Sequence, residues 1–342
     1  MRFLIVRAGA LGDTLMATPV VTALAERHPG ARIDFLASAG AAPLLADRTE
    51  IATVLTLRHR NWPYWLSAEK RALVRRIRGA RYDAAIVLEH APRYYELVER
   101  AGVSRVTGFR DTPFDPALHS IANNLRAAGF DDYAQRSWRM LIAPPDAGLP
   151  VARQLRENHP GPLVGIHVGY GPGRRKKDQH TRLRGWSLPN WAEVASRLVD
   201  RGATLVLTGA QEDRPSIDQL RPLLPPRNIV DLAGALALRD SVSLIASLDL
   251  LVSVDSGPAH IAAAVGTPVV VLWGPGILAQ TRPVSSASRV EIVREAVPCA
   301  PCYGTPAMRA CRQNICMEQI APARVAETIE AVLREGPIAS PE

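Results

Sequence analysis

The sequence predicts an α/β protein built from two doubly wound parallel sheets. Short runs rich in β-branched residues alternate with segments rich in Ala, Leu and Arg, which is the pattern of parallel strands joined by helices. The alternation stops at a proline-rich stretch, residues 143–150, and then resumes. With 342 residues, the chain is long enough for two domains that each bury a core.

We expect one domain at residues 1–150 and a second at residues 151–335. The predicted strands of the two domains cover residues 3–7, 32–37, 51–57, 84–88 and 104–108, and then 163–168, 203–208, 228–232, 250–254 and 269–273. A single continuous sheet is the less favoured alternative, because open sheets rarely exceed about ten strands. A final helix is expected at residues 321–335, where Val325, Ile329 and Val332 form an apolar stripe.

Composition and charge exclude several classes of protein. Hydrophobic residues make up 47% of the chain and charged residues 22%, which argues against collagen-like, disordered and disulfide-rich proteins. Asp13 interrupts the apolar start of the chain, no cleavage-site pattern follows, and no window is apolar enough to span a bilayer. We therefore expect a cytoplasmic protein or one peripheral to a membrane face. A net charge of +8 suggests an anionic partner.

A first candidate binding loop, residues 7–14, lies between the first predicted strand and a helix. Ligands of open α/β sheets bind at the carboxyl ends of strands, so this loop is well placed. Gly9 and Gly12 allow a tight turn and close approach of the backbone to a ligand. Asp13 can cap the helix, or it can accept a proton from a hydroxyl group as a general base; its position alone does not separate these roles.

A second candidate loop, residues 253–260, ends a buried strand and opens an Ala-rich helix. Asp255 or Ser256 can cap this helix, and Gly257 suits its first turn. A diphosphate at this point would meet the helix N-terminus and the Ser256 hydroxyl. His260 is either a packed structural residue or part of the anion site, and its neighbours favour the second role.

Two more strand-end loops carry charge. Residues 169–177 combine glycines with a basic run, and Arg182 and Arg184 follow. Such a loop suits phosphate oxygens, although most of the run can equally be a solvated surface. Nucleic acid is not an expected partner, because the charge is concentrated in one loop. In residues 208–213, the acids Glu212 and Asp213 can accept hydrogen bonds from ribose hydroxyls or cap the next helix.

All four cysteines lie between residues 299 and 316, as Cys299, Cys302, Cys311 and Cys316. Four thiolates with this spacing can surround one tetrahedral zinc or iron ion. Four reduced thiols, or disulfides in an oxidising compartment, are the alternatives. A metal is favoured because a C-x-x-C pair with two nearby partners rarely arises by chance. We expect its role to be structural, away from the strand-end loops.

In this order, the loops resemble glycosyltransferase family 9, the family of ADP-heptose:lipopolysaccharide heptosyltransferases. The resemblance covers roughly residues 1–335 and is strongest at LGDTLMATPV, GWSLPNWAEVA and VDSGPAHIAAAVGTPVVVLWGP. It implies a B-type glycosyltransferase fold, with two Rossmann-like domains facing a central cleft. The N-terminal domain would bind the acceptor and the C-terminal domain the sugar nucleotide. The implied reaction inverts the anomeric centre and needs no cofactor or divalent metal.

The resemblance also implies a role for each candidate residue. Asp13 corresponds to the general base that deprotonates the acceptor hydroxyl, in a loop that Gly9 and Gly12 share on the acceptor side. The donor diphosphate and sugar would be held by Asp255, Ser256, Gly257 and His260.

Two further donor residues follow from the resemblance, and one of them departs from the family pattern. Glu212 matches the pattern and corresponds to the acid near the adenosine ribose. Arg184 stands where relatives usually have Lys in a Lys-x-Trp-Pro pattern, and Ser187 replaces the Pro. The cation is kept but its geometry differs. Many relatives have a similar cysteine-rich loop, and some protein-modifying members hold iron there.

We therefore expect inverting transfer of a sugar, implied to be heptose from ADP-heptose, to a lipopolysaccharide core or a related glycolipid or protein acceptor. The enzyme would be cytoplasmic or peripheral to the cytoplasmic face of the inner membrane. Residues 58–65, with two arginines and two tryptophans, can meet an anionic glycolipid there or simply be solvated. The alternatives are a nucleotide-sugar epimerase of the same fold and a nucleotide-sugar-binding protein without transfer activity, which the presence of Asp13 disfavours.

Overall fold

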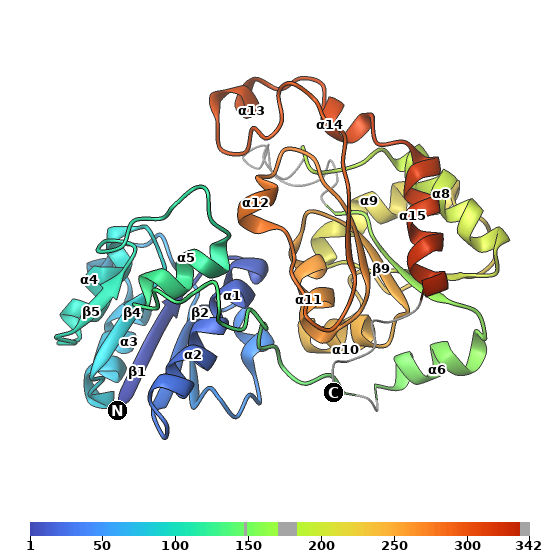
Figure 1. Ribbon diagram of the computed structural model, residues 1–342. Helices are drawn as coiled ribbons and strands as arrows, with labels where there is room; N and C mark the ends of the chain where they lie inside the picture. The colour runs from blue at the N-terminus through green and yellow to red at the C-terminus, as the bar shows by residue number, and fades with distance from the viewer. Residues whose placement is uncertain (147–148, 170–182, 336–342) are drawn as a thin grey trace. The chain divides into compact units, whose positions relative to one another are not determined.

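The computed structural model describes residues 1–146, 149–169 and 183–335 of the chain. The chain divides into two units, residues 1–144 and 145–342, and each unit is built around its own sheet (Figure 1). Within the described ranges, none of the helices has the length and apolar character that crossing a membrane requires.

The first unit contains a five-stranded parallel sheet with the order β3-β2-β1-β4-β5. Its strands are β1 (Arg2–Arg7), β2 (Arg32–Ser38), β3 (Thr53–Leu57), β4 (Ala84–Val87) and β5 (Val106–Gly108). Leu4 and Val6 of the central strand are fully buried, and Val6 pairs in register with Leu36 and Val87. Strands β2 and β3 lie on one side of β1, and β4 and β5 lie on the other, so the strand order reverses between β1 and β4. The loops after β1 and β4 therefore leave toward opposite faces of the sheet.

Helices cover this first sheet. They are α1 (Leu11–Ala17), α2 (Pro19–Arg27), α3 (Ala68–Ala80), α4 (Pro92–Arg100) and α5 (Ser120–Ala127), with short 3-10 turns at Ala42–Leu45 and Tyr64–Leu66. Side chains of α3 and α4 pack in one buried cluster with Leu4 and Val6. Because side chains alternate along a strand, the neighbouring residues of β1 point to the opposite face of the sheet. Helix α5 packs against α1 and α2.

The second unit contains a six-stranded parallel sheet with the order β11-β10-β9-β6-β7-β8. Its strands are β6 (Leu163–His167), β7 (Thr204–Leu207), β8 (Ile229–Asp231), β9 (Leu250–Val254), β10 (Val269–Leu272) and β11 (Val290–Val293). Its helices are α6 (Pro150–Asn158), α8 (Leu188–Asp200), α9 (Arg214–Leu220), α10 (Leu238–Ala246), α11 (Gly257–Val265), α12 (Leu278–Thr281), α13 (Pro306–Ala310), α14 (Ile315–Glu318) and α15 (Pro322–Glu335). Short 3-10 turns lie on either side of α9, at Gln211–Asp213 and Arg221–Leu223. The strand order reverses between β6 and β9.

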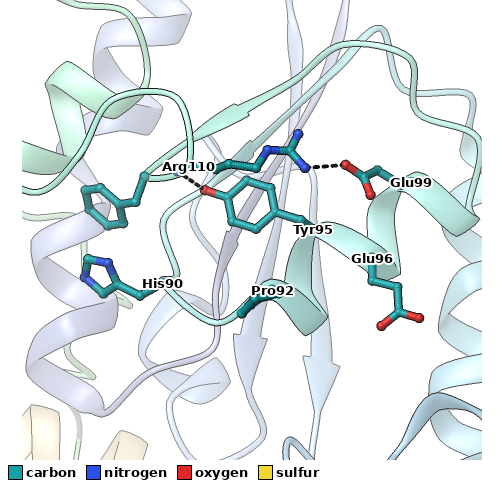
Figure 2. Close-up of a pocket in the computed structure, with 7 residues that line it drawn as sticks. His90, Pro92, Tyr95, Glu96, Glu99 and Arg110 are labelled. Atoms are coloured by element: carbon teal, nitrogen blue, oxygen red, sulfur yellow. Dashed lines mark hydrogen bonds and ion pairs between the residues drawn. The ribbon is translucent and has the colours of Figure 1, made fainter.

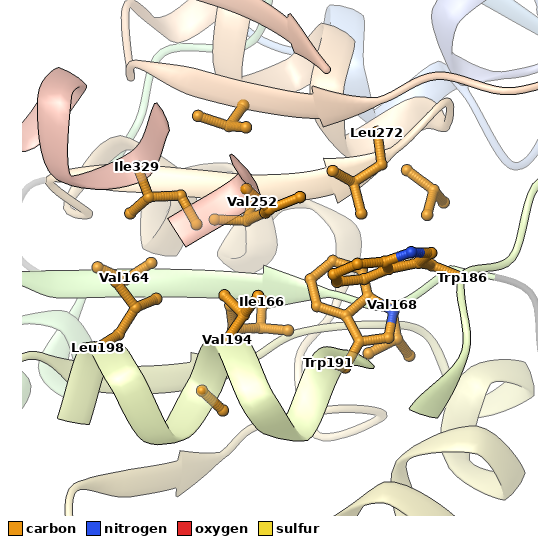
Figure 3. Packing of buried hydrophobic residues seen from close by; sticks show 14 of the residues in the cluster. Val164, Ile166, Val168, Trp186, Trp191, Val194, Leu198, Val252, Leu272 and Ile329 are labelled. Carbon is orange, nitrogen blue, oxygen red and sulfur yellow. The ribbon is translucent and has the colours of Figure 1, made fainter. Parts of the chain in front are cut away.

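Two tryptophans anchor the core of this second unit (Figure 3). Trp191 of α8 is 1% exposed, and its ring meets the edge of Trp186 with 5.2 Å between centroids. Both rings pack in one cluster with Ile166 and Val252 of the sheet and Ile329 of α15. Helices α8 and α15 are therefore held on one face of the sheet by the same apolar side chains.

The ten strands predicted from sequence are all present, within a few residues of their expected bounds. The prediction missed β11, whose residues are mostly half-buried because this strand lies at the edge of the sheet. The final helix is confirmed as α15, and Val325, Ile329 and Val332 are buried as the apolar stripe predicts.

Replacing Trp191 with Ala should destabilise the second unit by about 3–5 kcal/mol, because the change removes a buried ring and leaves a cavity. Urea denaturation followed by circular dichroism measures this loss. Trp65→Ala is the matched control, since Trp65 is 71% exposed; its effect should stay within about 0.5 kcal/mol. A loss below about 1 kcal/mol for Trp191→Ala would contradict the anchoring role.

Candidate functional site

Each sheet carries a cluster of polar side chains where its strand order reverses. In the first unit the cluster follows β1 and β4, and in the second unit it follows β9, which is the neighbour of β6. The reversal sends the connections after two adjacent strands to opposite faces, which opens a crevice at the carboxyl ends of the strands. We describe the two clusters separately.

Asp13 caps the helix that follows β1. Its Oδ2 accepts a hydrogen bond of 3.2 Å from the backbone N–H of Ala10, the residue before α1. Its Oδ1 lies 3.0 Å from Nη2 of Arg7, the last residue of β1. Of the two roles that the sequence leaves open, the capping contact is therefore present, made from the third position of the helix to the N-cap residue. The side chain is still 37% exposed, so capping leaves the carboxylate accessible to a ligand.

The loop around Asp13 is held tightly. A Cβ atom on Gly9 would lie 2.8 Å from both Cβ and Oδ2 of Asp13, so only glycine fits beside this carboxylate. The Ser38 hydroxyl donates to the carbonyl of Gly9 at 2.9 Å, and Nη1 of Arg60 donates to the carbonyl of Ala8 at 2.7 Å. Gly12 is buried in the first turn of α1.

Glu89 is a member of this cluster that sequence analysis missed. Its Oε2 lies 4.0 Å from Nη1 of Arg7, so Arg7 stands between two carboxylates, those of Asp13 and Glu89. Burial raises the pKa of Glu89, the charge of Asp13 raises it further, and Arg7 lowers it. The signal was an acid directly after the strand beside β1, in the segment IVLEH.

In the second unit, Asp255 and Arg184 form a buried ion pair. Oδ2 of Asp255 lies 3.4 Å from Nε of Arg184, and Nη1 of Arg184 donates to the carbonyl of Asp255 at 3.3 Å. The Asp255 side chain is 6% exposed, and burial raises its pKa while Arg184 lowers it. A Cβ on Gly276 would lie 2.7 Å from Oδ2 of Asp255, so this glycine lets the backbone pack on the carboxylate.

Helix α11 starts at Gly257, two residues after Asp255. Ser256 is its N-cap residue, but within the described part of the chain neither Ser256 nor Asp255 supplies a capping side chain, so that prediction is wrong. The reason is that the Ser256 hydroxyl lies 2.9 Å from the hydroxyl of Ser253. Gly257 is the first residue of the helix, and His260 is buried in its first turn. The backbone N–H groups at this helix end are suited to an anion.

Glu212 is exposed after β7, the strand beside β6. Of the two acids in this loop, Asp213 makes the capping contact that the sequence allowed: its Oδ2 accepts from the N–H of Ala210 at 2.8 Å. The Glu212 carboxylate is thus presented at the same sheet edge as Asp255. The predicted basic run, residues 174–177, lies outside the described residues together with Tyr170 to Gly173 and Arg182.

The four cysteines do not form the expected metal site. All four are free, so the disulfide alternative also fails. Among the described residues, no group of three or more His, Cys, Asp or Glu side chains is arranged to hold a metal ion. Cys299 is exposed, and the Cys311 thiol donates to the carbonyl of Gln313. Burial raises the pKa of Cys302 and raises that of Cys316 to about 11, and the neighbouring cysteines raise both pKa values further.

The cysteine segment also lies closer to the strand-end loops than we expected. The Tyr303 ring lies 4.8 Å from the Arg184 guanidinium carbon, and the side-chain amide of Asn314 donates to the carbonyl of Gly185 at 3.0 Å. The N–H groups of Cys302 and Tyr303 donate to the carbonyl of Pro275, at 3.1 and 3.0 Å. This segment therefore braces the residues around Asp255 and Arg184.

Comparison with known proteins agrees with this arrangement. The model of glycosyltransferase family 9 (heptosyltransferase) matches residues 180–311, which include Arg184, Asp255 and the start of α11. Lipopolysaccharide heptosyltransferase 2 of Escherichia coli K12 is 26% identical over 319 residues, covering 85% of this chain and 87% of that protein. Lipopolysaccharide heptosyltransferase 1 of Pseudomonas aeruginosa is 26% identical and covers 97% and 98%.

The chain is similar to heptosyltransferases of glycosyltransferase family 9 over most of its length. Its fold is that of the solved E. coli ADP-heptose lipopolysaccharide heptosyltransferase II, with a TM-score of 0.76 at 23% identity over 98% of this chain and 99% of that one. The predicted B-type glycosyltransferase fold is thus confirmed. Similarity of this extent supports glycosyltransferase as the class of enzyme.

Asp255→Asn should raise the melting temperature of the protein, and the increase should grow with pH. The ordinary carboxyl pKa is 3.8, and the folded protein raises it. The folded state therefore holds the proton more tightly than the unfolded chain, so stability falls as pH rises through the folded pKa. Differential scanning fluorimetry from about pH 4 to about pH 8 measures the difference.

Asp200→Asn is the control for this experiment, because Asp200 is an exposed member of a surface ion pair with Arg227. Its melting temperature should follow that of the unchanged protein at every pH. An Asp255→Asn variant that melts lower than the unchanged protein across the whole range would show that the ion pair with Arg184 outweighs the cost of burial.

Proposed function

We propose that this chain transfers heptose from ADP-heptose to a lipopolysaccharide inner core or a related acceptor, with inversion at the anomeric carbon. The observation that carries the proposal is the near full-length similarity to lipopolysaccharide heptosyltransferases, joined to two polar clusters at the switch points of the two sheets. The proposed reaction is a single displacement. The acceptor hydroxyl attacks the anomeric carbon, and ADP leaves from the opposite side.

In this proposal the first unit binds the acceptor and Asp13 is the general base. The base accepts the proton of the attacking hydroxyl as the new glycosidic bond forms. The geometry supports this role, because Gly9, Ala10 and Arg7 hold the carboxylate in one position while 37% of it stays exposed. Nη2 of Arg7 lies 3.0 Å from Oδ1 of Asp13, so the ion pair helps to fix the orientation of the carboxylate.

The second unit binds the donor in this proposal. The bond between the anomeric carbon and the diphosphate breaks, and negative charge develops on ADP. Arg184 and the N-terminus of α11 supply positive charge for this leaving group, and the Ser256 hydroxyl can donate to it. Asp255, Gly257 and His260 line the same helix start, and Glu212 accepts hydrogen bonds from the ribose hydroxyls. The step as written requires no metal ion.

We also propose that the first unit contacts the cytoplasmic face of the inner membrane, where a lipid-linked acceptor would be found. Trp62, Trp65 and Leu66 are 54%, 71% and 55% exposed, so three large apolar side chains stand close together in the sequence on the surface. Nζ of Lys70 donates to the carbonyls of Arg60 and Trp62, which holds this segment in place. Exposed tryptophans beside basic residues suit a bilayer interface.

The direct test incubates the purified chain with ADP-heptose and a heptose-deficient lipopolysaccharide core. Mass spectrometry should find the core heavier by one heptose, and the anomeric configuration of the new linkage, measured by NMR, should be opposite to that of the donor. Donor consumed without added acceptor would instead favour an epimerase. Binding of ADP-heptose without any product would favour a protein that only binds the donor.

Asp13→Asn should lower the rate of transfer by about 10²- to 10⁴-fold while leaving ADP affinity unchanged, because the amide oxygen can still cap α1 but cannot accept the proton. Steady-state kinetics and titration calorimetry with ADP measure the two effects. Asp13→Ala, which removes both the cap and the base, should be equally inactive and less stable. Retention of most activity by the Asn variant would mean that Asp13 acts only as a cap.

Arg184→Ala should weaken ADP binding by about tenfold to a hundredfold, because it removes a charged hydrogen-bond donor from the diphosphate. Arg184→Lys should keep most of the affinity, since the positive charge remains. Arg201→Ala is the control, because Arg201 is 70% exposed in the same unit. Calorimetry with ADP measures all three variants. Equal affinity in the Ala variant and the unchanged protein would remove Arg184 from the donor site.

A further inference from the structure

The first unit contains a cavity of about 450 Å³ that the roles proposed above do not use (Figure 2). It lies between the start of α4 and the segment that follows β5. A volume of this size accommodates a small ligand. His90, the residue directly after Glu89, lines the cavity, so the cavity adjoins the segment that follows β4 at the switch point.

Three aromatic rings line the cavity, those of His90, Tyr95 and Phe109. The rings of His90 and Phe109 are stacked, with 4.6 Å between centroids and an angle of 11°, and Phe114 meets both rings edge-on. The Tyr95 ring lies below the guanidinium of Arg110, 4.5 Å from its carbon (Figure 2). Aromatic faces are flat, apolar and electron-rich, so they attract the C–H groups on one face of a sugar ring.

The Tyr95 side chain is fixed in the cavity wall. Its hydroxyl donates to the carbonyl of Val87 at 3.2 Å and accepts from the N–H of Arg110 at 2.8 Å. Val87 is the last residue of β4, so the ring is tied directly to the sheet. The wall is therefore formed before any ligand binds, which lowers the entropic cost of binding.

Each charged side chain that lines the cavity has an ion-pair partner. Nη1 of Arg110 donates to Oε1 of Glu99 at 2.6 Å, and Asp111 lies 3.9 Å from the same guanidinium. Glu96 pairs with Arg100 at 2.6 Å. His90 also lines the cavity. Burial lowers its pKa, and the charge of Arg7 lowers it further. Among the described lining residues there is thus no unmatched cation to attract a phosphate.

The polar groups that remain suit hydroxyls. Carboxylate oxygens have several acceptor sites each, so Glu96 and Glu99 can accept from hydroxyl groups while they keep their arginine partners. A sugar ring presents C–H groups on one face and hydroxyls at its edge, which matches an aromatic wall beside two carboxylates. A phosphate or carboxylate in the same place would meet no unpaired cation among the described lining residues, because Arg110 is already paired with Glu99.

We propose that this cavity is a subsite for an uncharged sugar ring of the acceptor, adjacent to the sugar that carries the attacking hydroxyl. The assignment rests on the proposed function, because it takes the acceptor to be a carbohydrate bound by the first unit. The cavity adds a specificity that the cluster around Asp13 does not supply. It selects acceptors in which the sugar next to the one with the attacking hydroxyl carries hydroxyls and no phosphate. Phosphorylated parts of the acceptor lie elsewhere.

Saturation-transfer NMR on the full-length chain tests the subsite without any transfer reaction. The probes are methyl α-D-mannopyranoside, which is uncharged, and mannose 6-phosphate. The uncharged probe should receive saturation, and its signal should fall to background in His90→Ala and fall by roughly threefold in Glu96→Gln. Mannose 6-phosphate should give a weaker signal than the uncharged probe. An equal or stronger signal from the phosphate, or an undiminished signal in His90→Ala, overturns the proposal.

Kinetics separates this subsite from the proposed function. With a core acceptor, His90→Ala should raise the acceptor KM by roughly three- to tenfold while kcat and ADP affinity stay unchanged. Glu26→Gln, an exposed change in the same unit, should alter none of these values, and melting temperatures confirm that each variant folds. If transfer occurs but the acceptor KM does not respond, the subsite is wrong. If the unchanged chain transfers nothing yet binds the uncharged sugar through His90, the function is wrong and the subsite stands.

Discussion

The reversal of strand order beside the first strand of each sheet is the constraint on which the rest of this structure depends. All strands of a parallel sheet end at one edge, and only at the reversal do the connections after two neighbouring strands leave toward opposite faces. Asp13 and Glu89 meet through Arg7 because β1 and β4 are neighbours there, although 76 positions separate these acids, from 13 to 89. Asp255 and α11 occupy the corresponding place in the second sheet.

Charge at these two edges is kept at a cost in stability. Asp255 and Glu89 are buried enough for their pKa values to be raised, and each is only partly compensated by one arginine. A fold selected for stability alone would place uncharged groups there, since buried carboxylates are expensive. The cost is consistent with a site in which charge must be present before the substrate binds, because fixed charges stabilise a charged leaving group without reorganising.

The cysteine segment shows how a motif can be recognised and still be misinterpreted. The spacing of the four cysteines predicted a metal site remote from the other loops. The structure instead turns the Cys311 thiol toward a backbone carbonyl and brings Tyr303 beneath Arg184. The backbone of the segment is bonded to the Pro275 carbonyl, next to the glycine that packs on Asp255. The contribution of this segment to the site is therefore carried by its backbone and by an aromatic ring.

The sequence by itself determined the strands, the order of the two series and the residues that follow each strand, because alternation of apolar runs and turn residues is a local property. It therefore located Asp13, Asp255 and α11 correctly. Only the tertiary structure decided that Asp213, not Glu212, caps the turn after β7, that Glu89 joins Asp13 through Arg7, and that a sugar-sized cavity lies between α4 and β5. These features depend on which strands become neighbours and on where side chains point, and neither is encoded by local periodicity.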